Sequence, residues 1–320
     1  MEEQFENNYS ESCLTNDGMK YLKVRTLVDT ESLKRSSRLK AALAKKGIQY
    51  SAVNRKEILS IRRQLFSQIG NHNELDDIIR IVFSQLFGDI NHDSLKQALT
   101  QVATNGDEYW AGWNSVYRDD IRAHIQHNFV REPSITDLRS LLRKIDAELS
   151  PVVKGYTVIS WYNQWSSTII ERIFQTHARV VPTVRRIDKV DFFLRNIPID
   201  LKMTFLPEQF IRQAKRNLGA RDDSAVIDIV RDQPLVLAKW LYENQGEFRF
   251  SDSNRLFIVL MDENDLSQSW KLKSDFELIE SDARKYLESN DTLPSVEWDY
   301  EGDRISGHYR THSDVLLIAR

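Results

Sequence analysis

The stretch VDFFLRNIPIDLKMT, residues 190–204, combines two strand-like apolar runs with charged residues that strands disfavour. Arg195 and Asn196 separate the two runs, which predicts a β-hairpin with a two-residue turn. Such turns usually prefer Asn-Gly, so the turn residues alone would also allow a slipped register. A slip by one residue would break the apolar face of the hairpin, and the alternation therefore favours a turn at this pair.

The register of this hairpin brings two carboxylates together. Counted outward from the turn, the predicted pairs are Leu194 with Ile197, Phe193 with Pro198 and Phe192 with Ile199. Asp191 would come next, opposite Asp200, with Cβ atoms about 4.5–5.5 Å apart. Strand alternation places Lys202 on the same face as Asp200. The opposite face would be a continuous apolar surface of Phe192, Leu194, Ile199, Leu201 and Met203.

Adjacent carboxylates can share a proton, join a salt-bridge cluster or bind a divalent cation. A nearby lysine, Lys202, favours the second and third arrangements. Two acids, the backbone carbonyl of Leu201 and open water positions are a donor set that suits Mg²⁺. Such a metal activates a bound water and stabilises a phosphoryl group, while Lys202 could orient or deprotonate that water. The charge cluster thus predicts phosphodiester hydrolysis, with a purely structural salt-bridge cluster as the alternative.

Composition predicts an ordinary globular chain. Of the 320 residues, 41% are hydrophobic and 28% are charged, and no apolar run is long enough to span a bilayer. The polar start MEEQFENNYSES lacks a signal-peptide core, and the single cysteine, Cys13, excludes a disulfide framework or a multi-cysteine zinc site. We therefore expect a cytoplasmic protein of a bacterium or archaeon that makes no membrane contact.

Charge is unevenly distributed along the chain, although the net charge is only -3. Residues 20–63 contain 13 Lys or Arg against three acids, and residues 171–221 contain 11 against five. Residues 262–303 instead contain four Lys or Arg against 13 acids. Two basic segments suit a protein that presents a positive face to a polyanion such as DNA. Solvated helices with uneven charge would produce the same pattern.

The order of the predicted elements divides the chain near residue 150. Residues 1–150 read as helices, with a role in DNA binding or dimerisation, and Pro151 is expected to close the last of them. From Tyr156 the order is a helix, three strands, a helical segment and a strand, within a second domain at 151–320. The expected fold is α/β (α+β), with a mixed central sheet flanked by helices and a helical N-terminal region.

The hairpin acids and this order of elements resemble the PD-(D/E)XK nuclease superfamily, the fold of most type II restriction endonucleases. The matching residues are Asp191 and the triplet Asp200-Leu201-Lys202, and Glu171 lies on the preceding helix where that family often has a further acid. Val190 stands where the family has proline, and Asp188 is a rival first acid. The resemblance covers roughly Tyr156 to Met261 and gives no counterpart for the N-terminal helices.

The resemblance implies a Mg²⁺-dependent, site-specific endonuclease for double-stranded DNA. Asp191, Asp200, the carbonyl of Leu201 and Glu171 would bind Mg²⁺, and Lys202 would assist the attacking water. Expected partners are duplex DNA, a second copy of the chain as a homodimer, and a DNA methyltransferase encoded nearby. Alternatives are another nuclease on the same core (phage defence, repair or junction resolution) or an inactive DNA-binding protein. Residues expected to contact DNA phosphates are Arg185, Arg186, Arg195, Arg212, Lys215 and Arg216.

Overall fold

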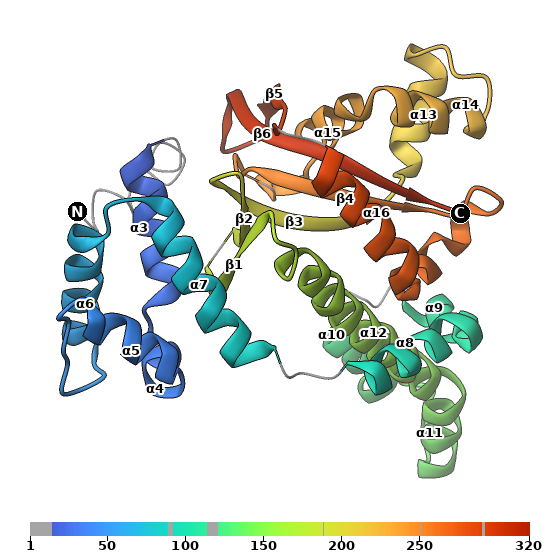
Figure 1. Ribbon diagram of the computed structural model, residues 1–320. Helices are drawn as coiled ribbons and strands as arrows, with labels where there is room; N and C mark the ends of the chain where they lie inside the picture. The colour runs from blue at the N-terminus through green and yellow to red at the C-terminus, as the bar shows by residue number, and fades with distance from the viewer. Residues whose placement is uncertain (1–14, 89–91, 114–120, 188, 250, 290–291) are drawn as a thin grey trace.

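A mixed sheet of six strands organises the molecule, and helices lie against both of its faces (Figure 1). The computed structural model describes residues 15–88, 92–113, 121–187, 189–249, 251–289 and 292–320. The strand order is β1-β2-β3-β4-β6-β5, with β3, β4 and β6 parallel and the remaining neighbours antiparallel. The expected α/β class, with a mixed sheet flanked by helices, is confirmed.

The strands are β1 (Val180–Ile187), β2 (Val190–Leu194), β3 (Ile197–Phe205), β4 (Arg255–Met261), β5 (Ser295–Glu301) and β6 (Ser306–Ala319). The helices before the sheet are α3 (Asn16–Leu27), α4 (Thr30–Arg35), α5 (Ser37–Lys45), α6 (Arg55–Gln68), α7 (His72–Phe87), α8 (Asp93–Asn105), α9 (Asp107–Trp113), α10 (Ile121–Ile125), η1 (Gln126–Val130), α11 (Leu138–Lys144), η2 (Ile145–Leu149) and α12 (Ser150–Gln175). The later helices are α13 (Glu208–Asn217), α14 (Asp223–Asp232), α15 (Pro234–Glu243), η3 (Gly246–Phe248), η4 (Leu266–Ser274) and α16 (Phe276–Ser289).

The hairpin β2–β3 has the predicted turn and register near the turn. Arg195 and Asn196 have φ values of 53° and 60°, as the two central residues of a type I′ turn do. The three predicted pairs, Leu194 with Ile197, Phe193 with Pro198 and Phe192 with Ile199, are confirmed. The pairing ends there, so the expected Asp191–Asp200 pair is not part of the ladder. From Asp200 onward, β3 pairs instead with β4.

The hairpin is buried on both faces, which differs from the expectation of one apolar and one charged face. Phe192 and Leu194 pack in the core that α12 covers, as expected. On the other side, Phe193 packs with residues of the N-terminal helices α3 to α7 in a second core. A third core lies between α13–α15 and the parallel strands. The N-terminal helices therefore share a core with the sheet.

Helical backbone continues through Pro151, where a boundary was expected. Helix α11 runs through the π-helical turn η2 directly into α12. Proline removes a backbone donor and normally interrupts the helix. In this chain the regular i→i−4 pattern is already broken by the π-helical turn immediately before Pro151, so the proline sits at a position that tolerates it.

Candidate active site

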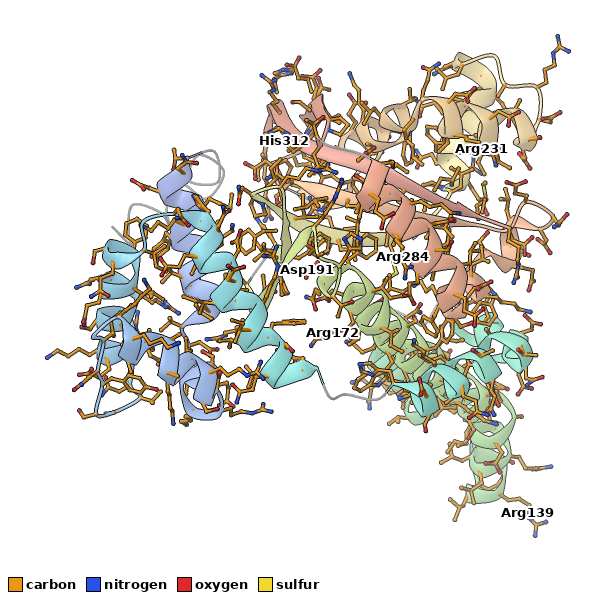
Figure 2. The ribbon with its side chains drawn as sticks, in the orientation of Figure 1. Arg139, Arg172, Asp191, Arg231, Arg284 and His312 are labelled. Atoms are coloured by element: carbon orange, nitrogen blue, oxygen red, sulfur yellow. The ribbon has the colours of Figure 1, made fainter. Side chains whose placement is uncertain are left out.

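A groove of about 400 Å³ runs along α12 beside the start of β2 and the middle of β3. We call it the α12 groove. Its walls are Ser160, Asn163, Gln164, Ser167, Thr168 and Glu171 of α12, Asp191 of β2, Leu201, Lys202 and Met203 of β3, and Lys273 of η4. Figure 2 labels Asp191 where the hairpin meets α12. A polar, almost uncharged face of α12 therefore forms one wall of the groove, which four of the predicted site residues line.

Gln175 joins the two acids of the α12 groove. Its side-chain amide Nε2 donates to Glu171 Oε1 at 2.7 Å and to the backbone oxygen of Asp191 at 3.0 Å. Gln175 is one helical turn after Glu171 and is itself buried, so its position is fixed by packing. The hydrogen bonds connect the Glu171 side chain of α12 to the Asp191 backbone of β2.

The carboxylate of Asp191 is buried and held by the backbone. Its Oδ2 accepts a hydrogen bond from the backbone nitrogen of Leu201 at 2.8 Å. Its backbone oxygen also accepts from Thr183 Oγ1 at 2.8 Å, which anchors β2 to β1. Only 6% of Asp191 is exposed, so its side chain has little freedom to leave this position.

The carboxylate of Asp200 forms two ion pairs. Its Oδ1 lies 2.8 Å from Lys202 Nζ, and its Oδ2 lies 2.8 Å from Arg255 Nη2. Arg255 comes from β4 and is only 2% exposed, whereas the Lys202 side chain is about two-fifths exposed. Asp200 is not among the residues that line the α12 groove. It therefore forms the salt-bridge arrangement that the sequence left open, beside the groove rather than in it.

The groove residues supply oxygen donors that suit Mg²⁺ but do not form a complete cage. Among the described residues, no group of three or more His, Cys, Asp or Glu is placed to hold a metal ion. The α12 groove supplies the carboxylates of Glu171 and Asp191, and oxygen donors of this kind are what Mg²⁺ prefers. Mg²⁺ commonly takes one or two protein carboxylates together with waters and substrate phosphate. The donor set of the groove fits that limited form of coordination.

The six residues expected to contact DNA are scattered. Arg185 pairs with Asp29 of the N-terminal region, its Nε 3.3 Å from Asp29 Oδ2. Arg212, Lys215 and Arg216 lie exposed on α13, which Figure 1 shows well away from β1. Lys215 Nζ is also 2.6 Å from Asp223 Oδ1. The structure thus does not gather these side chains into one basic patch.

The remaining two of these residues do not supply such a patch either. The terminal nitrogens Nη1 and Nη2 of Arg195 are buried, and neither has a hydrogen-bond partner among the residues that the structure describes. Burial raises the pKa of Tyr286 and of Asp314, and the charge of Arg195 partly offsets both rises. The side chain of Arg186 and the rival acid Asp188 lie outside the described residues.

Two functional candidates were missed by the sequence reasoning. Arg255 begins the apolar run RLFIVLM, where it reads as a boundary residue, yet it is the buried partner of Asp200. Lys273 lines the α12 groove with its Nζ 2.6 Å from Asn163 Oδ1. Burial lowers the pKa of Lys273 to about 8. No local pattern marks either residue, because each reaches its partner only through the packing of distant segments.

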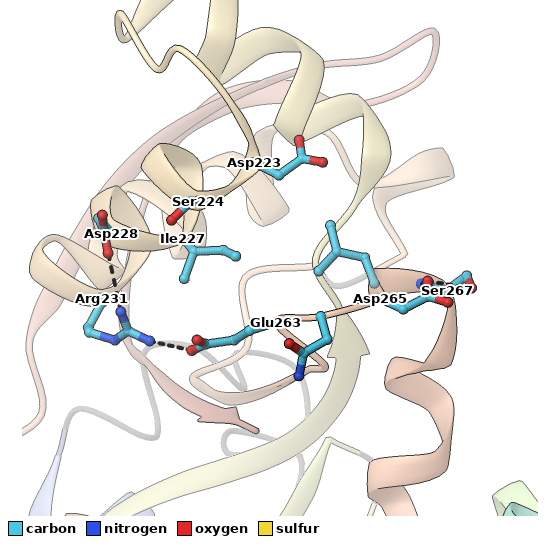
Figure 3. A pocket seen from close by; sticks show the side chains of 10 residues that line it. Asp223, Ser224, Ile227, Asp228, Arg231, Glu263, Asp265 and Ser267 are labelled. Atoms are coloured by element: carbon cyan, nitrogen blue, oxygen red, sulfur yellow. Dashed lines mark hydrogen bonds and ion pairs between the residues drawn. The ribbon is translucent and has the colours of Figure 1, made fainter.

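A second hollow, of about 420 Å³, lies between α14 and the segment after β4 (Figure 3). Arg231 lies in its wall and pairs with Asp228 at 3.2 Å and with Glu263 at 2.6 Å. Asp223 and Asp265 also line it. None of the predicted site residues does, so this hollow is separate from the α12 groove.

Comparisons with protein-family models, with curated proteins and with solved structures found no match. None of the helices in the described part of the chain is long and apolar enough to cross a membrane.

Proposed function

We propose that the chain is a Mg²⁺-dependent endonuclease for double-stranded DNA, of the type II restriction class. The observation that carries this proposal is the convergence of Glu171 and Asp191, from α12 and β2, on the groove that Leu201 and Lys202 also line. The Gln175 amide donates to the Glu171 carboxylate and to the Asp191 backbone oxygen, and the Asp191 carboxylate is held by the Leu201 backbone nitrogen. Preorganised acids of this kind are what a metal-assisted hydrolase requires.

Four residues of the groove, and Asp200 beside it, have a role in this proposal. Glu171, Asp191 and the Leu201 carbonyl would hold Mg²⁺, which would supply Lewis-acid activation of water and charge stabilisation on the phosphoryl group. The Asp200 carboxylate lies 2.8 Å from Lys202 Nζ and 2.8 Å from Arg255 Nη2. It would join these ligands only after one of these two ion pairs breaks. Lys202 would donate to the scissile phosphate or orient the attacking water, because its ammonium is held beside the groove by Asp200.

The restriction class adds partners that belong to the proposal as well. Cleavage of both strands at a symmetric site is most simply achieved by a two-fold homodimer. A DNA methyltransferase encoded nearby would protect the host's own sites. The three basic residues of α13 are exposed and would contact the DNA backbone outside the α12 groove, once Lys215 leaves Asp223.

A second candidate is a DNA-binding protein with an inactive nuclease-like core. It is favoured by the ion pairs of Asp200, because a carboxylate satisfied by Arg255 and Lys202 can serve the fold alone. On this view the α12 groove would bind DNA without cutting it.

The test is digestion of unmethylated phage DNA by the purified protein with Mg²⁺, with EDTA as a control. Asp191→Asn keeps an oxygen that can accept from Leu201, and Glu171→Gln keeps one that can accept from Gln175, so both should fold. Glu280→Gln is the matched control, because Glu280 pairs with Arg284 on the surface of α16. We expect discrete fragments from the wild type and Glu280→Gln, and none from the groove variants or with EDTA.

Other outcomes distinguish the alternatives. A Mg²⁺-dependent smear would support a nuclease but contradict the restriction class. Binding of DNA by the wild type without any cleavage would favour the inactive core. Equal cleavage by the wild type and both groove variants would mean that the active site is elsewhere.

A further inference from the structure

Lys273 occupies an unusual position for a lysine. It lies near the end of η4, and 9% of the residue is exposed. Its ammonium donates to Asn163 Oδ1 at 2.6 Å and sits 5.3 Å from the centre of the Phe205 ring. These contacts hold the head group at the wall of the α12 groove, which Lys273 lines together with Asn163.

No carboxylate of the described residues forms an ion pair with Lys273. An ammonium removed from water without a counter-ion is destabilised, because one amide oxygen and one aromatic ring replace little of its hydration. The cause of its lowered pKa is burial alone, consistent with the lack of a nearby opposite charge. A cation in this state gains most when an anion enters the groove.

The wall beside Lys273 suits the oxygens of an anion. The α12 residues nearest to it along the helix are Ser160, Asn163, Gln164 and Ser167, which carry hydroxyl or amide groups and no charge. Ser160 Oγ is buried without a hydrogen-bond partner among the described residues. Hydroxyl and amide donors of this kind are common contacts of nucleic-acid phosphates.

The groove is longer than one phosphate group. Asn163 and Glu171 are eight residues apart on α12, which corresponds to about 12 Å along a helix axis. Lys273 is therefore at one part of the groove and the acids Glu171 and Asp191 at another. A strand of duplex DNA presents a phosphate every ~3.4 Å of axis, so several successive phosphates correspond to that length.

We propose that Lys273 binds a phosphate that flanks the scissile phosphate on the same DNA strand. The hydroxyl and amide groups of α12 would be additional donors to this flanking phosphate. The inference rests on the proposed function and adds a substrate-binding position to it. In this arrangement Lys273 fixes the register of the strand along α12, while Glu171 and Asp191 act at the scissile phosphate.

The test measures binding of a fluorescently labelled DNA duplex in EDTA at a series of salt concentrations. Removal of one phosphate contact lowers the slope of log K against log salt by about 0.9. We expect Lys273→Met to bind more weakly and to show this smaller slope, whereas Lys273→Arg keeps the wild-type slope. Lys285→Met is the control with the same charge change, because Lys285 pairs with Asp282 on the exposed side of α16.

The outcomes separate this inference from the proposed function. If the wild type binds and cuts DNA and Lys273→Met shows the same affinity and the same salt slope, the role of Lys273 is overturned and the proposed nuclease function is not. A wild type that neither binds nor cuts DNA would overturn both. If binding in EDTA is too weak to measure, the readout is cleavage, where a raised KM at unchanged kcat supports the inference and unchanged KM overturns it. Thermal unfolding by circular dichroism confirms that each variant is folded.

Discussion

Asp200 and Arg255 are register partners on the parallel strands β3 and β4, and Arg255 Nη2 donates to Asp200 Oδ2 at 2.8 Å. Both side chains are almost fully buried, with 6% and 2% of their surfaces exposed. A buried pair of this kind adds little net stability compared with apolar residues, but removal of one partner leaves the other charge in the sheet. This relationship determines how any substitution of Asp200 must be interpreted.

Asp200→Ala should lower the free energy of unfolding by roughly 3–5 kcal/mol, because the Arg255 guanidinium stays buried without that carboxylate. The double variant Asp200→Ala/Arg255→Met should recover most of the loss. Urea-induced unfolding followed by circular dichroism measures both. A loss below about 1 kcal/mol for the single variant would show that the pair is not buried in solution as it is here.

Gln175→Leu should impair Mg²⁺-dependent cleavage by about 10–100-fold, since it removes the amide that orients Glu171 and the Asp191 backbone. We expect the Mg²⁺ concentration for half-maximal cleavage to rise, and DNA binding in EDTA to stay unchanged. Gln213→Leu on α13 is the control, because Gln213 bonds the Trp240 indole at the surface. Equal metal dependence for wild type and Gln175→Leu would contradict the role of this amide.

Lys273→Met should stabilise the protein at neutral pH. The folded-state pKa of Lys273, about 8, lies below the ordinary value of 10.5, so the unfolded chain binds the proton more tightly. The resulting cost of about 3 kcal/mol is fully present below pH 8 and is lost as the pH rises from about 8 to 10.5.

The stability of the wild type, relative to Lys273→Met, should therefore increase over that pH range. Urea-induced unfolding at pH 7, 9 and about 10.5 measures the difference between the two proteins, in which the other titrating groups cancel. A difference that does not change with pH would show that Lys273 is not buried as an uncompensated cation. Greater stability combined with weaker DNA binding would indicate a residue retained for function.

Asp76→Ala should destabilise the attachment of the N-terminal helices to the sheet. Lys23 of α3 is fully buried and pairs with Asp76 of α7, and its Nζ also donates to Asn196 Oδ1 in the hairpin turn at 2.7 Å. Loss of Asp76 leaves that ammonium buried, at a cost of roughly 3–5 kcal/mol in unfolding free energy.

The matched comparison is Glu74→Ala, which breaks the more exposed pair with Lys46 at 2.6 Å and should cost less than about 1 kcal/mol. Both variants are compared by thermal and urea-induced unfolding. Similar losses for the two would contradict the distinction between a buried and a surface pair.

Local sequence patterns predicted the parts of the fold that depend on which face of a segment is apolar. The hairpin turn at Arg195 and Asn196, and the three pairs next to it, follow from alternation, because a slipped register would expose the apolar face. The strand Arg255–Met261 was likewise evident from its continuous apolar run. The same pattern could not show that the N-terminal helices cover Phe193, since a strand buried on both faces differs little from one buried on a single face over so few residues.

The sequence by itself determined the α/β class and the hairpin register near its turn. Only the tertiary structure decided that Asp200 pairs with Arg255, that Gln175 joins the two acids, and that Lys273 enters the α12 groove. The physical reason is the distance along the sequence over which each feature is decided. Apolar periodicity reports the burial of each segment from its own residues, whereas the partner of a charge depends on which distant segment is packed against it.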